Sequence, residues 1–186
     1  MGHVLSARGT GPADVEVKAF VDAREWTNAA EVRSFLGLVN FTARFMPDLA
    51  TVSATLRQLT KSGEPFVWGP EQQQSFDELK KRPSSAETLS YFDKNAPTKV
   101  IADASPVGLG AVQVQEQGRF IIYASRSLSD TESRYFQTEK EALAIVWACE
   151  RFHAYLCGAE FELMTDHKPL ECIFSLESKT CTRIER

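Results

Sequence analysis

The chain has 186 residues, 43% of them hydrophobic, which is enough for one or two domains with a substantial core. Its net charge of −4 is not that of a strongly basic nucleic-acid-binding protein, and the acidic excess falls after residue 82. The sequence contains no signal-peptide pattern and no apolar run long enough for a membrane helix, and its four cysteines lack zinc-site spacing. We therefore expect an intracellular protein, in cytoplasm or nucleus, that is not secreted and has no membrane partner.

The first predicted helix begins near Asn28, which with Glu31 can cap its amino end. The apolar residues that follow have the spacing of a buried helical face: Val32, Phe35, Leu36 and Val39. Gly37 lies within this helix and costs roughly 1 kcal/mol relative to Ala. A glycine at this position indicates that another group approaches the helix backbone closely. That group is either an external ligand or another helix packed against this one.

Two further helices are predicted before the chain changes character. The first runs around Ser53 to Thr60 and ends near Gly63, and Pro70 suits the first turn of the next. The run ArgProSerSer at 82–85 then marks the entry to a region of short strands.

Three strand-like runs follow one another, at residues 98–103, 108–115 and 119–125, with a turn at Gly118. A helix from about Asp130 to Tyr155 and a strand at 161–166 come next, followed by the start of another helix. The predicted order is βββαβ, so the fold class is α/β.

The long helix places one acidic residue on its buried face. Ser129 and Glu132 read as a capping box and Gly158 as a stop. One apolar stripe contains Ile145, Ala148, Cys149, Phe152 and Leu156. Glu141 lies on that stripe, while Glu139 points nearly the opposite way and reads as ordinary surface. A buried carboxylate is costly unless it is paired, hydrogen-bonded or bound to a metal; the alternative is a first-turn acid that favours the helix dipole.

Two aspartates end strands in the same region. Asp103 closes the first strand and Asp166 the fourth, and singly each has an ordinary explanation, a turn residue for Asp103 and a helix N-cap for Asp166. Together with Glu141 they form an oxygen-ligand set suited to a hard divalent cation such as Mg²⁺. His167 follows Asp166 and is considered as a general base, although a simple surface role is preferred.

Four blocks, in order, resemble the ribonuclease H domain of gypsy-type LTR retrotransposon polyproteins. They are AspAlaSerProValGlyLeuGlyAla from 103, TyrAlaSerArgSerLeuSer from 123, ThrGluLysGluAlaLeuAlaIleValTrpAla from 138 and ThrAspHisLysProLeu from 165. The stretches 26–41 and 66–80 look like the thumb and connecting helices of the reverse transcriptase, and 2–6 resembles the last palm strand.

The resemblance implies a domain plan. Residues 1–20 would be the end of the polymerase palm, 21–64 a small helical thumb-like segment, and 65–186 a ribonuclease H-like domain with a lead-in helix and a mixed βββαβ sheet. In this family the domain continues through a fifth strand and a last helix bearing a fourth acidic ligand, whereas this chain stops at ArgIleGluArg. We therefore expect a C-terminally truncated fragment of a Pol polyprotein, with the remainder of that polyprotein as a partner.

The resemblance also implies a function and its residues. Asp103, Glu141 and Asp166 would be catalytic metal ligands for two Mg²⁺ ions, with Mn²⁺ as an alternative, in an endonuclease that hydrolyses the RNA strand of RNA:DNA hybrids. Ser105 would touch a phosphate or ribose. The minor groove of the duplex would be contacted by Arg33, Gly37, Asn40 and Phe41.

Some features depart from the family pattern and leave other functions open. The chain has no Asp-Asp pair, so it lacks the polymerase active site; Thr55 stands where the family often has Pro, and Pro83 interrupts a helix. A catalytically inactive nucleic-acid or protein interaction remnant is the main alternative. The glycine-rich run from Asp103 could also suggest a phosphate-binding loop of an actin-like ATPase. That signal is weak, because no helix amino end follows Gly110 to receive a phosphate.

Overall fold

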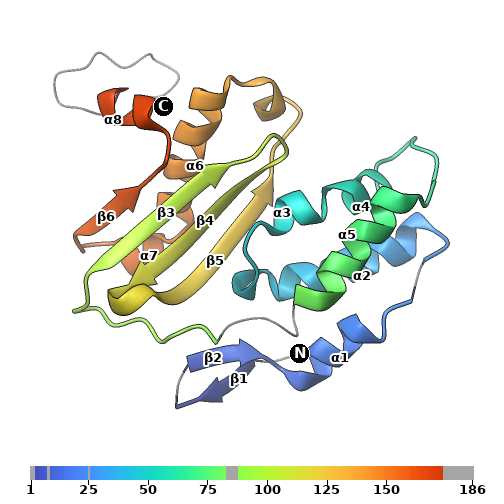
Figure 1. The fold of residues 1–186 in the computed structure, drawn as a ribbon, viewed down its shortest axis with the longest axis horizontal. Helices are drawn as coiled ribbons and strands as arrows, with labels where there is room; N and C mark the ends of the chain where they lie inside the picture. The colour runs from blue at the N-terminus through green and yellow to red at the C-terminus, as the bar shows by residue number, and fades with distance from the viewer. Residues whose placement is uncertain (1–2, 8, 25, 83–87, 174–186) are drawn as a thin grey trace.

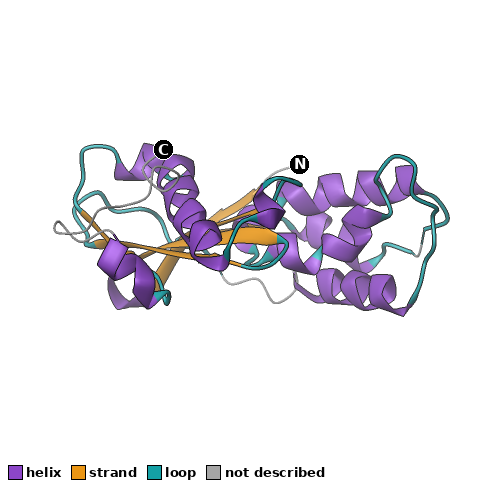
Figure 2. Ribbon diagram, turned by 90° about the horizontal axis from the view of Figure 1, so that it is seen from above, coloured by secondary structure: helices purple, strands orange, loops and turns teal. Residues whose placement is uncertain are grey.

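The computed structural model describes residues 3–7, 9–24, 26–82 and 88–173. They form two lobes that lie side by side, a helical lobe and a sheet lobe (Figures 1 and 2). The helical lobe consists of β1 (His3–Ser6), β2 (Gly9–Pro12), α1 (Asp14–Val21), α2 (Ala29–Phe41), η1 (Ala43–Phe45), α3 (Leu49–Val52), α4 (Ala54–Gln58) and α5 (Pro70–Lys81). The sheet lobe consists of β3 (Thr98–Ala104), β4 (Gly108–Gln115), η3 (Glu116–Gly118), β5 (Arg119–Ser127), η4 (Glu132–Arg134), α6 (Gln137–Arg151), α7 (His153–Leu156), β6 (Phe161–Met164) and α8 (Lys168–Ile173).

The helical lobe is built as its sequence predicts at α2 and α5. The Asn28 side chain accepts hydrogen bonds from the backbone N–H groups of Ala30 and Glu31, and the four predicted core residues of α2 are all buried. Pro70 occupies the first turn of α5. An aromatic cluster fills the space between α1, α2 and α5, and its members are Phe20, Trp26, Phe35, Trp68 and Phe76.

The predicted helix at 53–60 is shorter in the structure and is preceded by one that the sequence did not indicate. Helix α4 covers Ala54–Gln58, and the single turn α3 covers Leu49–Val52 directly before it. Asp48 begins α3 with a left-handed backbone, φ 52°. No periodic pattern predicts a four-residue helix, because it offers too few positions for one.

The sheet confirms the predicted βββαβ order. Its strand order is β5-β4-β3-β6, with β3 antiparallel to β4 and parallel to β6. Helices α6 and α7 cover the face that lies behind the strands in Figure 1. The core between sheet and helices includes Val100, Ala102, Leu109, Ala144, Ala148, Phe152 and Leu156.

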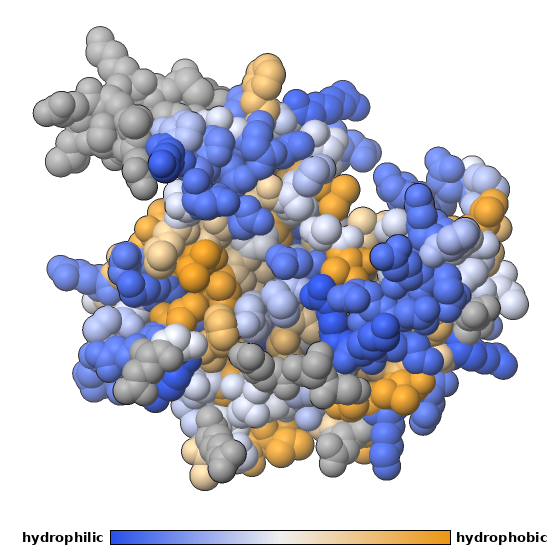
Figure 3. All heavy atoms as spheres, in the orientation of Figure 1, coloured by the Kyte–Doolittle hydropathy of each residue, from blue (hydrophilic) through white to orange (hydrophobic). Residues whose placement is uncertain are grey.

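The other face of β3 and β6 is open to solvent and carries cross-strand pairs. Lys99 forms an ion pair with Glu162 at 2.7 Å, and Ile101 lies opposite Met164 in the register. Figure 3 shows hydrophobic side chains gathering over the sheet in this view, whereas hydrophilic ones predominate over the helical lobe. Within the described ranges, no helix combines the length and apolar character that a membrane span requires.

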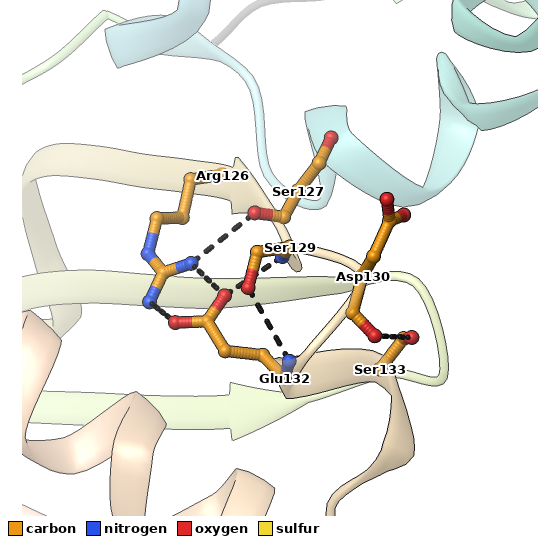
Figure 4. A network of polar contacts seen from close by, with 6 residues as sticks. All are labelled: Arg126, Ser127, Ser129, Asp130, Glu132 and Ser133. Atoms are coloured by element: carbon orange, nitrogen blue, oxygen red, sulfur yellow. Dashed lines mark hydrogen bonds and ion pairs between the residues drawn. The ribbon is translucent and has the colours of Figure 1, made fainter.

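The long helix begins seven residues later than predicted. The Ser129–Glu132 capping box exists, with the Ser129 N–H donating to Glu132 Oε2 at 2.8 Å, but it closes the short turn η4 (Figure 4). Arg126 donates two hydrogen bonds to Glu132, at 2.8 and 2.9 Å, and its guanidinium lies 5.7 Å from the Trp147 ring centre. This network joins the end of β5 to η4 and to α6, and helix α6 starts at Gln137, after η4.

Candidate metal centre

Glu141 is the buried member of the centre. It lies one turn into α6, is 4% exposed, and receives two hydrogen bonds. Its Oε2 accepts from the backbone N–H of Ala104 at 3.1 Å, and its Oε1 accepts from Gln137 Nε2 at 2.5 Å. Gln137 Nε2 also donates to the Ala104 carbonyl at 2.9 Å. These contacts fix the glutamate against the end of β3.

Asp103 and Asp166 approach Glu141 from the sheet. Asp103 is the second-last residue of β3, and Asp166 follows β6, the parallel neighbour of β3. Parallel neighbours end at the same edge of a sheet, so these two positions lie together. One carboxylate oxygen from each of the three acids lies within 4.8 Å of the others. The predicted convergence is confirmed, while the role of the three acids as metal ligands stays a prediction.

The electrostatics of the cluster are unfavourable without a counter-charge. Burial is the largest cause that raises the pKa of the Glu141 carboxyl; the Gln137 hydrogen bond opposes it, and the charges of Asp103 and Asp166 raise it further. Asp103 and Asp166 themselves are exposed. Three carboxylates so placed are an oxygen donor set that fits a hard divalent cation, which would offset their repulsion.

Two polar residues beside the acids were missed or left open by the sequence. Gln137 lies four residues before Glu141 and thus on the same helix face, a spacing that could have revealed it. His167 was judged a surface residue, but it is half-buried and its Nε2 lies 3.0 Å from Thr138 Oγ1, in the first turn of α6. Its charge lowers the pKa of Glu141.

Glu139 is not the ordinary surface residue that the helical phase predicted. It is half-buried, and its Oε2 accepts the backbone N–H of Phe136 at 3.0 Å. Because α6 begins at Gln137, Glu139 belongs to the first turn and closes the amino end of the helix. It therefore has a structural role separate from that of Glu141.

The residues predicted to contact a duplex share one exposed face of α2. Arg33, Gly37, Asn40 and Phe41 are all exposed. A Cβ added at Gly37 would meet no atom within 4 Å, so the alternative that Gly37 allows close helix packing is wrong within the described residues. Arg33 donates to the Thr60 carbonyl at 2.9 Å, and the Phe41 ring stacks on His3 at 5.3 Å.

Ser105 lies in the turn between β3 and β4. Its hydroxyl donates to the Gly108 carbonyl at 3.1 Å, accepts the Gly108 N–H at 3.0 Å, and lies 2.9 Å from Thr51 Oγ1 of α3. The hydroxyl therefore stabilises the turn through Gly108 and forms a hydrogen bond with the helical lobe through Thr51. Pro83 and most of the predicted break at 82–85 lie outside the described residues.

Comparison with known proteins shows the family of the chain. Residues 68–163 match the family described as "RNase H-like domain found in reverse transcriptase". The Pol polyprotein of Drosophila melanogaster transposon 297 is 34% identical over 95% of this chain, and that of transposon gypsy 33% identical over 91%. The Tf2-3 polyprotein of Schizosaccharomyces pombe is 28% identical over 91% of the chain. The chain spans 17%, 18% and 13% of these three polyproteins.

Solved structures share the fold across the whole chain. The foamy viral protease-reverse transcriptase in complex with RNA/DNA hybrid superposes with a TM-score of 0.79, covering 100% of this chain and 26% of that one at 22% identity. The same enzyme in complex with double-stranded DNA gives 0.76 over 97% of this chain. The mixed sheet with its covering helices is therefore a ribonuclease H-like fold.

Proposed function

Because the chain belongs to the family of RNase H-like domains found in reverse transcriptases, we propose that it hydrolyses the RNA strand of RNA:DNA hybrids with divalent metal. The observation that carries this proposal is the convergence of Asp103, Glu141 and Asp166 within 4.8 Å. The foamy viral relative of the fold is described in complex with an RNA/DNA hybrid, which supports the same substrate class here. The relatives in sequence are parts of Pol polyproteins, so the rest of such a polyprotein is the proposed partner.

The buried acid and the two exposed acids differ in what they offer to the proposed chemistry. Two Mg²⁺ ions, or Mn²⁺, would activate water and stabilise the leaving 3′ oxygen when bound. Glu141 is held by the Ala104 N–H and by Gln137, so its carboxylate is preorganised and needs no reorientation. Asp103 and Asp166 are exposed, which leaves their oxygens accessible to water and to a phosphate group.

The exposed face of α2 is the proposed duplex contact. Arg33 and Asn40 offer donors to phosphate and sugar oxygens, and Gly37 leaves the helix backbone uncovered between them. A wide RNA-containing groove presents 2′-hydroxyls to such a surface. Ser105 is a second proposed contact near the acids, although its hydroxyl is already shared with Gly108 and Thr51.

The test is cleavage of a hybrid in which the RNA strand carries one fluorophore and the DNA strand another. The 186-residue chain and a longer polyprotein that contains it are both assayed with Mg²⁺. We expect cuts in the RNA strand alone, lost on addition of EDTA and in the variants Asp103→Asn and Glu141→Gln. A protein that is folded and binds metal in both contexts but leaves the hybrid intact would refute nuclease activity and favour an interaction role.

A further inference from the structure

The turn between β3 and β4 is held from both lobes at neighbouring residues. On one side, the backbone N–H of Ala104 donates to Glu141 Oε2 at 3.1 Å and its carbonyl accepts from Gln137 at 2.9 Å. On the other side, the next residue, Ser105, meets Thr51 of the helical lobe at 2.9 Å between hydroxyl oxygens. Ala104, which follows Asp103, is thus hydrogen-bonded to α6, and the next residue, Ser105, is hydrogen-bonded to α3.

Helix α3 fits closely against β4, which leaves this turn, and against β5 beside it. The backbone N–H of Ala50 donates to Ser125 Oγ of β5 at 2.9 Å. A Cβ added at Gly108 would lie 2.6 Å from the Ala50 Cβ and 2.9 Å from the Arg126 carbonyl, so glycine is needed for this approach. In Figure 1, α3 lies between β5 and the helices α4 and α5. Helix α3 is therefore one of the points at which the helical lobe packs against the sheet, and the short turn η1 packs against β5 beside it.

We propose that the helical lobe positions the metal centre through this contact, with Thr51 as a positioning residue for Asp103. The proposal rests on the proposed function, because it assumes that Asp103 is a metal ligand. Thr51 fixes Ser105, Ser105 fixes the turn through Gly108, and the turn sets where the Asp103 carboxylate stands relative to Glu141. Outer hydrogen-bond partners of metal ligands act in this way, and their loss typically weakens metal binding by roughly 10–100-fold.

The test compares two threonines that make the same kind of contact. Thr51→Val removes the hydroxyl that meets Ser105 and keeps the side-chain shape. The matched control, Thr55→Val, removes a hydroxyl that lies 2.6 Å from Ser75 Oγ inside the helical lobe. Mn²⁺ affinity is measured by calorimetric titration of the full chain, and exchange of the Ala104 amide hydrogen is followed by NMR.

Thr51→Val is expected to weaken Mn²⁺ binding about fivefold, below the range for direct partners of ligands, and to speed exchange at Ala104. Thr55→Val is expected to change neither. Unchanged Mn²⁺ affinity in Thr51→Val, or equal losses in both variants, would overturn the positioning role. Absence of Mn²⁺ binding by the wild type would instead refute the metal centre of the proposed function, and unchanged Ala104 exchange in Thr51→Val would still overturn the positioning contact.

Gly108→Ala gives an independent check through packing rather than hydrogen bonding. The added methyl group must push α3 away from the strands and also displace β5, since its nearest neighbours are the Ala50 Cβ at 2.6 Å and the Arg126 carbonyl at 2.9 Å. We expect a loss of Mn²⁺ affinity larger than in Thr51→Val, and partial recovery in the double variant with Ala50→Gly. Wild-type affinity in a folded Gly108→Ala protein would contradict the proposal.

Discussion

Gly37→Ala is expected to stabilise the protein because Gly37 lies in the interior of α2 without any packing reason. Its Cβ would meet no atom within 4 Å, so the substitution adds no strain. Ala exceeds Gly in helix propensity by roughly 1 kcal/mol, and it also lowers the entropy of the unfolded chain. We therefore expect the free energy of unfolding to rise by about 0.5–1 kcal/mol.

Urea unfolding followed by circular dichroism measures this change. A matched control is Gly108→Ala, where the added Cβ would lie 2.6 Å from the Ala50 Cβ and the sign should reverse. A loss of stability in Gly37→Ala would show that another group packs against α2 at Gly37, and it would refute the claim that the added methyl group enters open space.

The same position separates stability from binding. Gly37→Leu should leave the fold intact, because the side chain extends into open space, yet a bulky group on the exposed face should weaken hybrid binding. Fluorescence anisotropy with a labelled hybrid in Ca²⁺ reports affinity without cleavage. Equal affinity of Gly37→Leu and the wild type would remove this face from the proposed duplex contact.

Two further predictions concern stability. Gln113 is 0% exposed and its side-chain amide has no partner among the described residues, so Gln113→Met should raise the free energy of unfolding by about 1–2 kcal/mol; destabilisation measured by urea unfolding would indicate a bound water or other partner. The hydrogen bonds from Arg126 are the main cause that lowers the pKa of Glu132 to about 2, from 4.5. Because this pKa is depressed, its stabilisation is present above about pH 4.5 and is lost as pH falls toward 2. Glu132→Gln should therefore lose roughly 1–2 kcal/mol at neutral pH, after allowance for solvent screening, and less at pH 3; an equal loss at both values would contradict the ion-pair explanation.

The sequence predicted the parts of the fold that carry strong periodicity. The βββαβ order and the buried face of α2 follow from alternation or helical spacing, and both are confirmed. The predicted stripe of the long helix is confirmed in part, since Ile145 and Ala148 are buried in α6 whereas Cys149 is half-buried. Helix α6 ends at Arg151, so Phe152 follows it and Leu156 belongs to α7, although both are buried. The start of α6 was wrong because the Ser129–Glu132 pair is a genuine cap, but of a short turn. Local chemistry indicates that a helix begins there and cannot say how far it continues.

The sequence predicted the three acidic residues of the candidate site but not the hydrogen bonds that position them. Glu141 was identified as a carboxylate on an apolar stripe, and the strand ends supplied Asp103 and Asp166. The contacts from Ala104 and Thr51 depend on how the backbone turns and how α3 meets the sheet. Such long-range contacts have no periodic signature, so only the three-dimensional structure reveals them.

Thermal unfolding of Glu141→Gln with and without Mn²⁺ tests the central claim, that the three carboxylates hold a divalent metal, most directly. The control is Glu139→Gln, since glutamine can still accept the Phe136 N–H at the helix start. The wild type and the control should both unfold at higher temperature with Mn²⁺. Glu141→Gln should gain little from Mn²⁺, because the amide lacks the negative charge and one of the two acceptor oxygens of the carboxylate. A Mn²⁺-induced increase in Glu141→Gln equal to that of the wild type would contradict the claim.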